Sequence, residues 1–279
     1  MNFIPIIHNS SFITYSSLFK MDLGLKDKII IVTGGAKGIG QGIVESIAAE
    51  GAFPIIVGRN EKDNNALLST LPQGDQVAAE LSDPMTCEKI IATVLEKYGR
   101  IDGIVNNAGH NDGIGLENGS YEGFIESYHK NVVHYYLLVH YALSALKASK
   151  GSIVNISSKT AETGQGNTSG YAAANGARNA LTREWAVELL KYGIRSNAVV
   201  VAECMTPQYE KWIQTLSDPV EKLRSITKNI PLGQRMTTIK EIGDMVAFLL
   251  SEKSSHTTGQ LIHVDGGYVH LDRALANAD

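Results

Sequence analysis

Three glycines after a short apolar run are the first residues whose spacing could do chemistry. In "IIIVTGGAKGIGQGI", Gly34, Gly38 and Gly40 have the spacing Gly-x-x-x-Gly-x-Gly. Glycines let a backbone turn tightly and approach a ligand, and the first N–H groups of a helix favour an anion. The stretch predicts a dinucleotide pyrophosphate at the start of a helix near Gly38, with an ordinary glycine-rich loop as the alternative.

The next apolar run bears on which dinucleotide would bind. "PIIVGRN" ends in Gly58 and Arg59, where a fold that selects NAD usually carries an acidic residue for a ribose hydroxyl. Arg59 and Lys37 could instead hold a 2′-phosphate. We therefore predict NADP as the cofactor. The alternative is that both cations are surface charges and NAD is used as well.

The elements that would position these residues follow from seven short apolar runs. The runs are "KIIIVT", "AFPIIVG", "QVAAEL", "RIDGIVNN", "GSIVNIS", "GIRSNAVVV" and "GQLIHV". They are rich in Val and Ile, too short for buried helices, and separated by helical stretches. This alternation predicts an α/β fold, a single doubly wound Rossmann-type domain with a seven-stranded parallel sheet. Residues 207–240 break the alternation and are expected to form a helical or loop insertion beside a substrate pocket.

Residues 1–20 differ in character from the rest of the chain. We expect a disordered extension or a misassigned start there, because "MDLGLKDKIIIVTGG" from Met21 reads as a natural beginning, and we assign the domain to residues 21–279. Polar residues at 9–11 interrupt the apolar stretch that a secretory signal would need. No stretch approaches eighteen uninterrupted apolar residues, so we expect a cytoplasmic protein without a membrane span.

Composition limits the partners. The chain has 279 residues, a formal net charge of −4 and no long run of Lys or Arg, which gives no electrostatic basis for binding nucleic acid or an anionic membrane. Cys87 and Cys204 lie far apart with no Cys or His at metal-ligand spacing, so neither a disulfide framework nor a metal site is expected. A small-molecule substrate in a reducing compartment is the prediction.

Five stretches in order give the chain a family resemblance. "TGGAKGIG", "NNAG" at 106–109, "NISS" at 155–158, "YAAAN" at 171–175 and "VDGG" at 264–267 resemble the short-chain dehydrogenase/reductase family, from about Leu25 to Tyr268. The resemblance implies that Ser158 holds the substrate oxygen and that Tyr171 is the acid/base. It implies that Asn131 supports a water in a proton relay. Ser158 precedes Tyr171 by thirteen residues, the usual separation in the family.

The same resemblance implies the remaining site residues, with no metal. Those assigned to the cofactor are Thr33, Gly34, Lys37, Gly38, Ile39, Gly40, Arg59, Leu81, Asn107, Ala108, Gly109, Tyr171, Asn175, Val201 and Thr206. Those assigned to the substrate are His110, Ser158, Lys159, Gly164 and Glu203. Val201 and Ala202 replace the usual Pro-Gly, and the carboxylate of Glu203 suits a polyhydroxylated substrate. A solvated loop acid is the alternative for Glu203.

Asn175 departs from the family, which has a lysine four residues after the tyrosine. A free tyrosine, with a pKa of about 10, needs a nearby positive charge to act as a base at neutral pH. In one interpretation Asn175 binds the nicotinamide ribose, and the cationic nicotinamide or Lys159 favours the tyrosinate. In a second, activity is largely lost, and in a third the asparagine is a cloning mutation. Arg178 lies about 10 Å along the axis from Tyr171, and we expect it at a surface or interface.

The substrate prediction comes from a subgroup. "SSKTAETGQG", "ALTREWAVELL", "VAECMTP" and "SSHTTGQLIHVDGGYVHLDRAL" resemble the L-fucose dehydrogenase group of this family. That resemblance implies oxidation of the C1 hydroxyl of a pyranose to a lactone. The alternatives are a 3-oxoacyl-thioester or other carbonyl reductase, and a catalytically impaired cofactor-binding relative.

The helix that carries Tyr171 has an apolar stripe of Leu181, Trp185 and Leu189, which predicts packing in the core. The family resemblance adds a two-fold bundle between this helix and a preceding one over about residues 121–147. It implies a homodimer or homotetramer.

Overall fold

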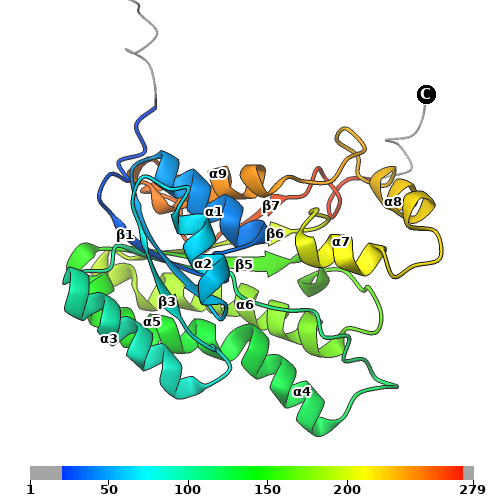
Figure 1. The fold of residues 1–279 in the computed structure, drawn as a ribbon, viewed down its shortest axis with the longest axis horizontal. Coiled ribbons are helices and arrows are strands. Elements are labelled where there is room, and N and C mark those ends of the chain that lie inside the picture. Colours follow the sequence, from blue (N-terminus) through cyan, green and yellow to red (C-terminus); the bar gives the residue numbers. More distant parts are fainter. Residues whose placement is uncertain (1–20, 273–279) are drawn as a thin grey trace, which may run out of the picture.

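The computed structural model describes residues 21–272, and the expectation for residues 1–20 lies outside that range. Its centre is a parallel sheet of seven strands in the order β3-β2-β1-β4-β5-β6-β7 (Figure 1). The strands are β1 (Ile29–Thr33), β2 (Phe53–Gly58), β3 (Asp75–Ala78), β4 (Gly103–Asn106), β5 (Ser152–Ser158), β6 (Arg195–Val201) and β7 (Leu261–Val264). Each comes from one of the seven apolar runs, so the predicted sheet and fold class are confirmed.

Helices cover both faces of the sheet (Figure 1). One layer contains α1 (Gly38–Ala49), α2 (Glu61–Leu68) and α9 (Ile239–Leu250), whose apolar residues share one core cluster. The opposite layer contains α3 (Pro84–Tyr98), α5 (His134–Ser149) and α6 (Ser169–Glu188), which share the second cluster. Trp185 and Leu189 are buried in that second cluster and Leu181 packs against it, as the apolar stripe predicts.

The strand order reverses beside β1, which pairs with β2 on one side and β4 on the other. Loops after these strands leave in opposite directions, so a crevice opens at the carboxyl ends of β1 and β4, where ligands of doubly wound sheets bind. The first glycine loop lies at this point.

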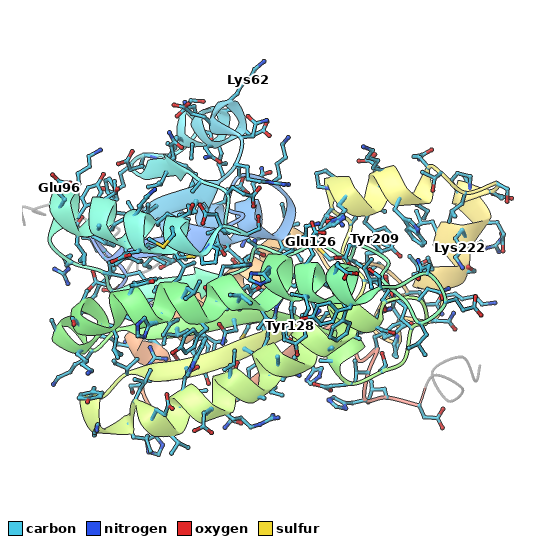
Figure 2. All side chains as sticks on the ribbon, turned by 90° about the horizontal axis from the view of Figure 1, so that it is seen from below. Lys62, Glu96, Glu126, Tyr128, Tyr209 and Lys222 are labelled. Atoms are coloured by element: carbon cyan, nitrogen blue, oxygen red, sulfur yellow. The ribbon has the colours of Figure 1, made fainter. Side chains whose placement is uncertain are left out.

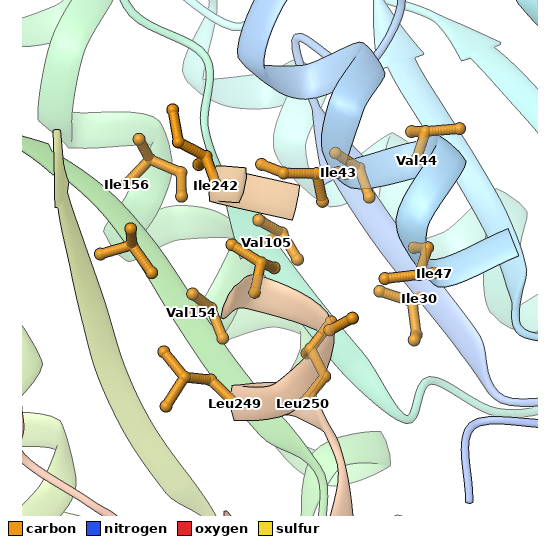
Figure 3. Packing of buried hydrophobic residues seen from close by; sticks show 14 of the residues in the cluster. Ile30, Ile43, Val44, Ile47, Val105, Val154, Ile156, Ile242, Leu249 and Leu250 are labelled. Atoms are coloured by element: carbon orange, nitrogen blue, oxygen red, sulfur yellow. The ribbon is translucent and has the colours of Figure 1, made fainter. Parts of the chain in front are cut away.

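Helices α1 and α9 pack closely enough to need glycine at the contact. A Cβ at Gly243 would lie 2.2 Å from the carbonyl oxygen of Gly42, and one at Gly42 would lie 2.3 Å from that of Ile239. In Figure 3, Ile43 of α1 lies beside Ile242 of α9, and Ile47 of α1 lies beside Ile30 of β1. The helix that begins at the glycine loop is therefore fixed against α9.

The helix expected over about residues 121–147 is not one regular helix. It comprises α4 (Tyr121–Tyr128), a π-helical turn (His129–Val133) and α5. The prediction of a continuous helix is wrong in this respect, because apolar periodicity carries no signal for a single wider turn, which is common at functional sites.

The insertion expected at 207–240 is confirmed as helical, with α7 (Pro207–Ile213) and α8 (Pro219–Thr227) at the carboxyl side of the sheet (Figure 1). Among residues 21–272, no helix has the length and apolar character needed to cross a bilayer.

Candidate active site

The glycine loop between β1 and α1 has the geometry of an anion cradle. Gly34 and Gly38 have φ of +61° and +57°, which side chains other than glycine rarely adopt, and a Cβ at Gly40 would lie 2.0 Å from the carbonyl oxygen of Gly34. The first turn of α1 has neither a side-chain cap nor an acidic residue, so its free N–H groups can donate hydrogen bonds to an anion. These residues fit a dinucleotide pyrophosphate.

The N-terminus of α7 lies next to the glycine loop. Thr206 is the N-cap of α7, and a Cβ at Gly38 would lie 3.3 Å from its side chain. The two segments, far apart in sequence, form opposite sides of the crevice. Ile39 differs from the loop glycines, because its side chain packs against the core beneath.

The strand ends at the switch point are tied together by one side chain. The Thr33 hydroxyl oxygen accepts from the backbone N–H groups of Asn107, at 2.9 Å, and Ala108, at 3.0 Å. The Asn107 amide donates to the Thr33 carbonyl at 2.8 Å. The fully buried Thr33 side chain therefore holds the ends of β1 and β4 together beside the crevice. Leu81 and Val201 also bury their side chains in the core, so any cofactor contact of theirs would come from the main chain.

Arg59 and Lys37, the residues assigned to a 2′-phosphate, are exposed and each has an acidic neighbour. The Arg59 Nη1 lies 3.4 Å from Glu80 Oε2, and the Lys37 Nζ lies 2.7 Å from Asp63 Oδ2. Their side chains are 78% and 60% exposed. The two acidic partners were not expected from the sequence, because nothing in the spacing places 63 or 80 beside the glycine loop.

Ser158, the last residue of β5, has an unused proton. Its oxygen accepts from the backbone N–H and the hydroxyl of Thr160, at 3.2 Å and 3.1 Å, and the hydroxyl donates to no described residue. Tyr171 lies in the first turn of α6, and its phenol oxygen has no hydrogen-bond partner among residues 21–272. The end of β5 lies against α6, where Ser157 donates to the Asn175 carbonyl at 3.5 Å. Both hydroxyls are thus available to a ligand.

Asn131 lies in the π-helical turn and is fully buried. Its amide Nδ2 donates to the carbonyls of His110, at 3.0 Å, and Ser127, at 2.9 Å, and its Oδ1 accepts from the His110 N–H at 2.7 Å. The side chain therefore fixes the segment after β4. The Asn131 backbone carbonyl accepts from Arg178 Nε at 2.7 Å, and support of a water by Asn131 stays a prediction.

Arg178 lies where the sequence did not predict it. It is 2% exposed, so the expected surface or interface position is wrong. Its Nη1 donates to Asn175 Oδ1 at 2.9 Å, and its Cζ lies 5.9 Å from the centre of the Tyr171 ring. The rise of about 10 Å between Tyr171 and Arg178 along the helix axis overstates their separation. Helical side chains point toward the N-terminus, and a long arginine side chain spans most of the two turns.

Asn175 is fully buried with both ends of its amide engaged. Besides accepting from Arg178, it donates through Nδ2 to the Tyr171 carbonyl at 2.8 Å. A contact with the nicotinamide ribose stays a prediction. The amide would have to turn away from these partners, or use its second Nδ2 proton, to make that contact.

A polar cluster follows Ser158. Lys159 forms an ion pair with Glu203, the Tyr209 hydroxyl donates to Glu203 Oε2 at 2.9 Å, and the Lys159 Nζ lies 4.4 Å from the centre of the Tyr268 ring. Tyr209, labelled in Figure 2, belongs to α7 of the insertion. The side chains of Lys159 and Glu203 are only 12% and 9% exposed, which excludes solvated loop charges. Burial and the Glu203 carboxylate raise the pKa of Tyr209, so it remains a donor.

The other residues assigned to the substrate lie differently. His110 connects the segment after β4 to α7, with 2.8 Å between its Nδ1 and Gln208 Nε2. Gly164 lies in an exposed loop, where a Cβ would have nothing within 4 Å. The structure therefore brings His110 to the insertion and leaves Gly164 open.

Neither of the two cysteines is poised to act as a nucleophile. Burial raises the pKa of the Cys87 thiol to about 11 and that of Cys204 to about 12, so both stay protonated at neutral pH. Among residues 21–272, one His/Glu group, made of Glu162, His263 and His270, brings its ligand atoms within 4.8 Å. Its central contact, His263 Nε2 to Glu162 Oε2 at 3.0 Å, is an ordinary side-chain hydrogen bond.

Comparison with known proteins agrees with this arrangement. A family model described as enoyl-(acyl carrier protein) reductase matches residues 34–269, which include the glycine loop, Ser158, Tyr171 and the last strand. The chain belongs to the short-chain dehydrogenase/reductase family. Membership in this family makes it a dehydrogenase/reductase that uses a nicotinamide cofactor and acts on CH–OH groups.

Three similar proteins illustrate the range within the short-chain dehydrogenase/reductase family. L-fucose dehydrogenase of Bos taurus is 33% identical, over 90% of this chain and 93% of that protein. L-xylulose reductase of the same organism is 35% identical, over 89% and 99%. The crystal structure of Cj0485 dehydrogenase is 47% identical, covers 93% of this chain and 100% of its own, and superposes with a TM-score of 0.89.

Proposed function

We propose that the protein oxidises the C1 hydroxyl of an aldopyranose of the L-fucose type, with NADP as the hydride acceptor. The observation that carries the substrate class is the buried Lys159–Glu203–Tyr209 cluster beside Ser158. A charged acceptor and several donors in a sheltered site match a ligand with many hydroxyls, because each buried hydroxyl needs a partner. The relatives named for L-fucose and L-xylulose support a sugar as substrate.

The chemistry assigned to the chain's own residues is proton handling. Ser158 donates its unused proton to the substrate oxygen, and Tyr171 as the phenolate takes the proton of the C1 hydroxyl. The bound nicotinamide supplies the acceptor for the hydride from C1. The C1–H and O–H bonds break and a C=O bond forms, so an aldose and NADP⁺ give a lactone, NADPH and a proton.

NADP preference rests on Arg59 and Lys37. Their ion pairs with Glu80 and Asp63 are exposed, and such pairs contribute only about 0–1 kcal/mol. A 2′-phosphate with its larger charge can therefore displace the carboxylates.

For Arg59→Ala we expect KM for NADP to rise about ten- to a hundredfold, the value of a lost charge-assisted hydrogen bond, with little change for NAD. Initial rates with both cofactors measure this. Lys62→Ala is the matched control, because Lys62 is exposed on neighbouring α2 (Figure 2) and should leave both KM values unchanged. Equal effects of Arg59→Ala on NADP and NAD would contradict the assignment.

The activity is tested by following reduced nicotinamide with L-fucose and related aldoses, using NADP and NAD, from neutral to alkaline pH. We expect turnover that rises toward alkaline pH, and loss of it in Tyr171→Phe. Cofactor binding without turnover of any aldose would refute the proposed substrate class.

A carbonyl reductase is the second candidate. The relative named L-xylulose reductase and the family model's description as an acyl-carrier-protein reductase favour it. Reduction of a ketose or a 3-oxoacyl thioester by NADPH, without aldose oxidation, would support this candidate. Binding of cofactor with neither reaction would support the impaired relative.

We also propose a cytoplasmic homodimer or homotetramer. Exposed apolar side chains on the layer of α3, α5 and α6 support association of subunits. Tyr136 on α5 is 50% exposed, and Val187 on α6 is 68% exposed. Two buried free cysteines are compatible with a reducing compartment. Cell fractionation tests the location, and recovery with membranes or outside the cytoplasm would contradict it.

A further inference from the structure

Arg178 is a buried cation with no acidic partner among residues 21–272. Its guanidinium donates to four neutral oxygens: the Ile156 carbonyl at 3.1 Å, the Asn131 carbonyl at 2.7 Å, Asn131 Oδ1 at 3.4 Å and Asn175 Oδ1 at 2.9 Å. Hydrogen bonds hold the group in place but leave its charge uncompensated. A buried, unpaired charge is costly, so its presence calls for a physical reason.

Two tyrosine rings face this charge. The Cζ of Arg178 lies 4.4 Å from the centre of the Tyr135 ring and 5.9 Å from that of Tyr171. The Tyr135 hydroxyl donates to the Ile156 carbonyl at 3.3 Å, whereas the Tyr171 hydroxyl has no partner among the described residues. Tyr171 is thus the ring whose oxygen is free to lose a proton.

Among the titratable groups around Arg178, Tyr171 is the one whose protonation state the charge can influence. The elements packed on α6 and the loops beside it carry other titratable groups: Tyr121, Glu122, Glu126 and Tyr128 on α4, His129 and Lys130 in the π-helical turn, His134 and Tyr135 on α5, and Asp112, Lys159, Glu162 and Glu203. Glu126 and Lys130 form an ion pair with each other. Burial and then the Arg178 charge lower the pKa of His134 to about 3, and burial raises the pKa of Tyr135. Both remain neutral from neutral to alkaline pH, and the Lys159 charge is paired with Glu203.

Two other residues are matched to the guanidinium. A Cβ at Gly109 would lie 2.5 Å from Arg178 Nη2, so the absence of a side chain at 109 makes room for it. A lysine at 175 would bring a second buried cation against Arg178, whereas Asn175 offers it an oxygen. Asn175, Arg178 and Gly109 therefore form one coupled set.

We propose that Arg178 is a positioning residue that supplies, from one turn further along α6, the positive charge that the family's lysine supplies beside the tyrosine. In this arrangement Asn175 links the guanidinium to the Tyr171 turn, and the charge favours the phenolate that abstracts the substrate proton. The inference rests on the proposed function only in requiring that Tyr171 exchange a proton, whichever substrate is bound.

The test compares Arg178→Met with Arg178→Lys, because both lose the guanidinium hydrogen bonds and only the first loses the charge. Ultraviolet difference spectra against the same protein carrying Tyr171→Phe report Tyr171 ionisation without any substrate. We expect Arg178→Met to move that ionisation to higher pH by about one unit or more, with Arg178→Lys close to the parent. With an active substrate, kcat at neutral pH should fall about tenfold or more in Arg178→Met.

If Arg178→Met is unstable, a second variant that moves the positive charge from position 178 to position 175 still tests the proposal. Asn175→Lys alone should lower activity and thermal stability, because it places two cations together. Asn175→Lys combined with Arg178→Met should regain activity and the parent's pH profile. Equal spectra for the parent and Arg178→Met, or equal displacement in the Lys and Met variants, would overturn the proposal. A wrong substrate would leave the spectral result unaffected.

Discussion

Ser158 keeps a proton for a ligand because both of its internal hydrogen bonds come from Thr160. A hydroxyl that only accepts within the protein is oriented to donate outward, which a substrate oxygen requires. In the proposed reaction this hydroxyl is a preorganised donor, and donors of this kind contribute strongly to catalysis.

For Ser158→Ala we expect kcat to fall about a hundredfold or more, as when one preorganised donor is removed. Steady-state kinetics with the best aldose measures the change. Ser152→Ala is the matched control, because Ser152 lies at the other end of β5 and donates to the Leu249 carbonyl. That control should leave kcat unchanged, and a similar loss in both variants would show a general effect on β5 instead.

At the scale of elements, the crevice depends on how α1 is held. The helix begins at the glycine loop, and its middle packs on α9 through Gly42 and Gly243. Because a Cβ at either position would meet a backbone carbonyl, the contact can relax only by separating the helices.

Gly243→Ala should therefore lower the free energy of unfolding by about 2 kcal/mol, within the range for overpacking, and weaken cofactor binding. Urea unfolding and cofactor titration measure both effects. Gly176→Ala in α6 is the comparison, since a Cβ there meets nothing within 4 Å and should stabilise by about 0.5–1 kcal/mol. Destabilisation by Gly176→Ala would indicate that a second subunit covers that position.

At the scale of the whole molecule, α4, α5 and α6 expose large apolar side chains to solvent. Packing within a single chain does not explain this exposure. The large exposed apolar residues on α4, α5 and α6 and just after α6 are Tyr121, Phe124, Ile125, Tyr136, Val187 and Leu190. Large exposed apolar side chains on one layer of helices favour an interaction surface there. A second copy of this chain is the expected partner, in a symmetric contact.

We expect Val187→Glu to convert the assembly to a smaller species, because two-fold symmetry would place the new charges near each other in an apolar contact. Light scattering coupled to gel filtration measures the mass. Val220→Glu changes a residue on α8 that is even more exposed and lies away from this face, and it should leave the mass unchanged. A monomeric parent protein would remove the basis for the prediction.

The sequence alone determined the seven strands, the fold class and the family. Apolar runs with Val and Ile report burial in parallel strands directly, and five ordered motifs predict Ser158 and Tyr171 as site residues. It also showed that Asn175 is unusual, because that inference needs only the spacing from Tyr171.

Only the tertiary structure decided how the chain accommodates Asn175 in place of the family's lysine. Arg178 could have been suspected as a cation three residues after Asn175 on the same helix, but its direction depends on space at Gly109 and on carbonyls from β5 and the π-helical turn. The pairing of Lys159 with Glu203 and Tyr209 likewise joins residues from three separate segments. Local periodicity reports which residues are buried, whereas partners across the fold are fixed only when the chain has packed.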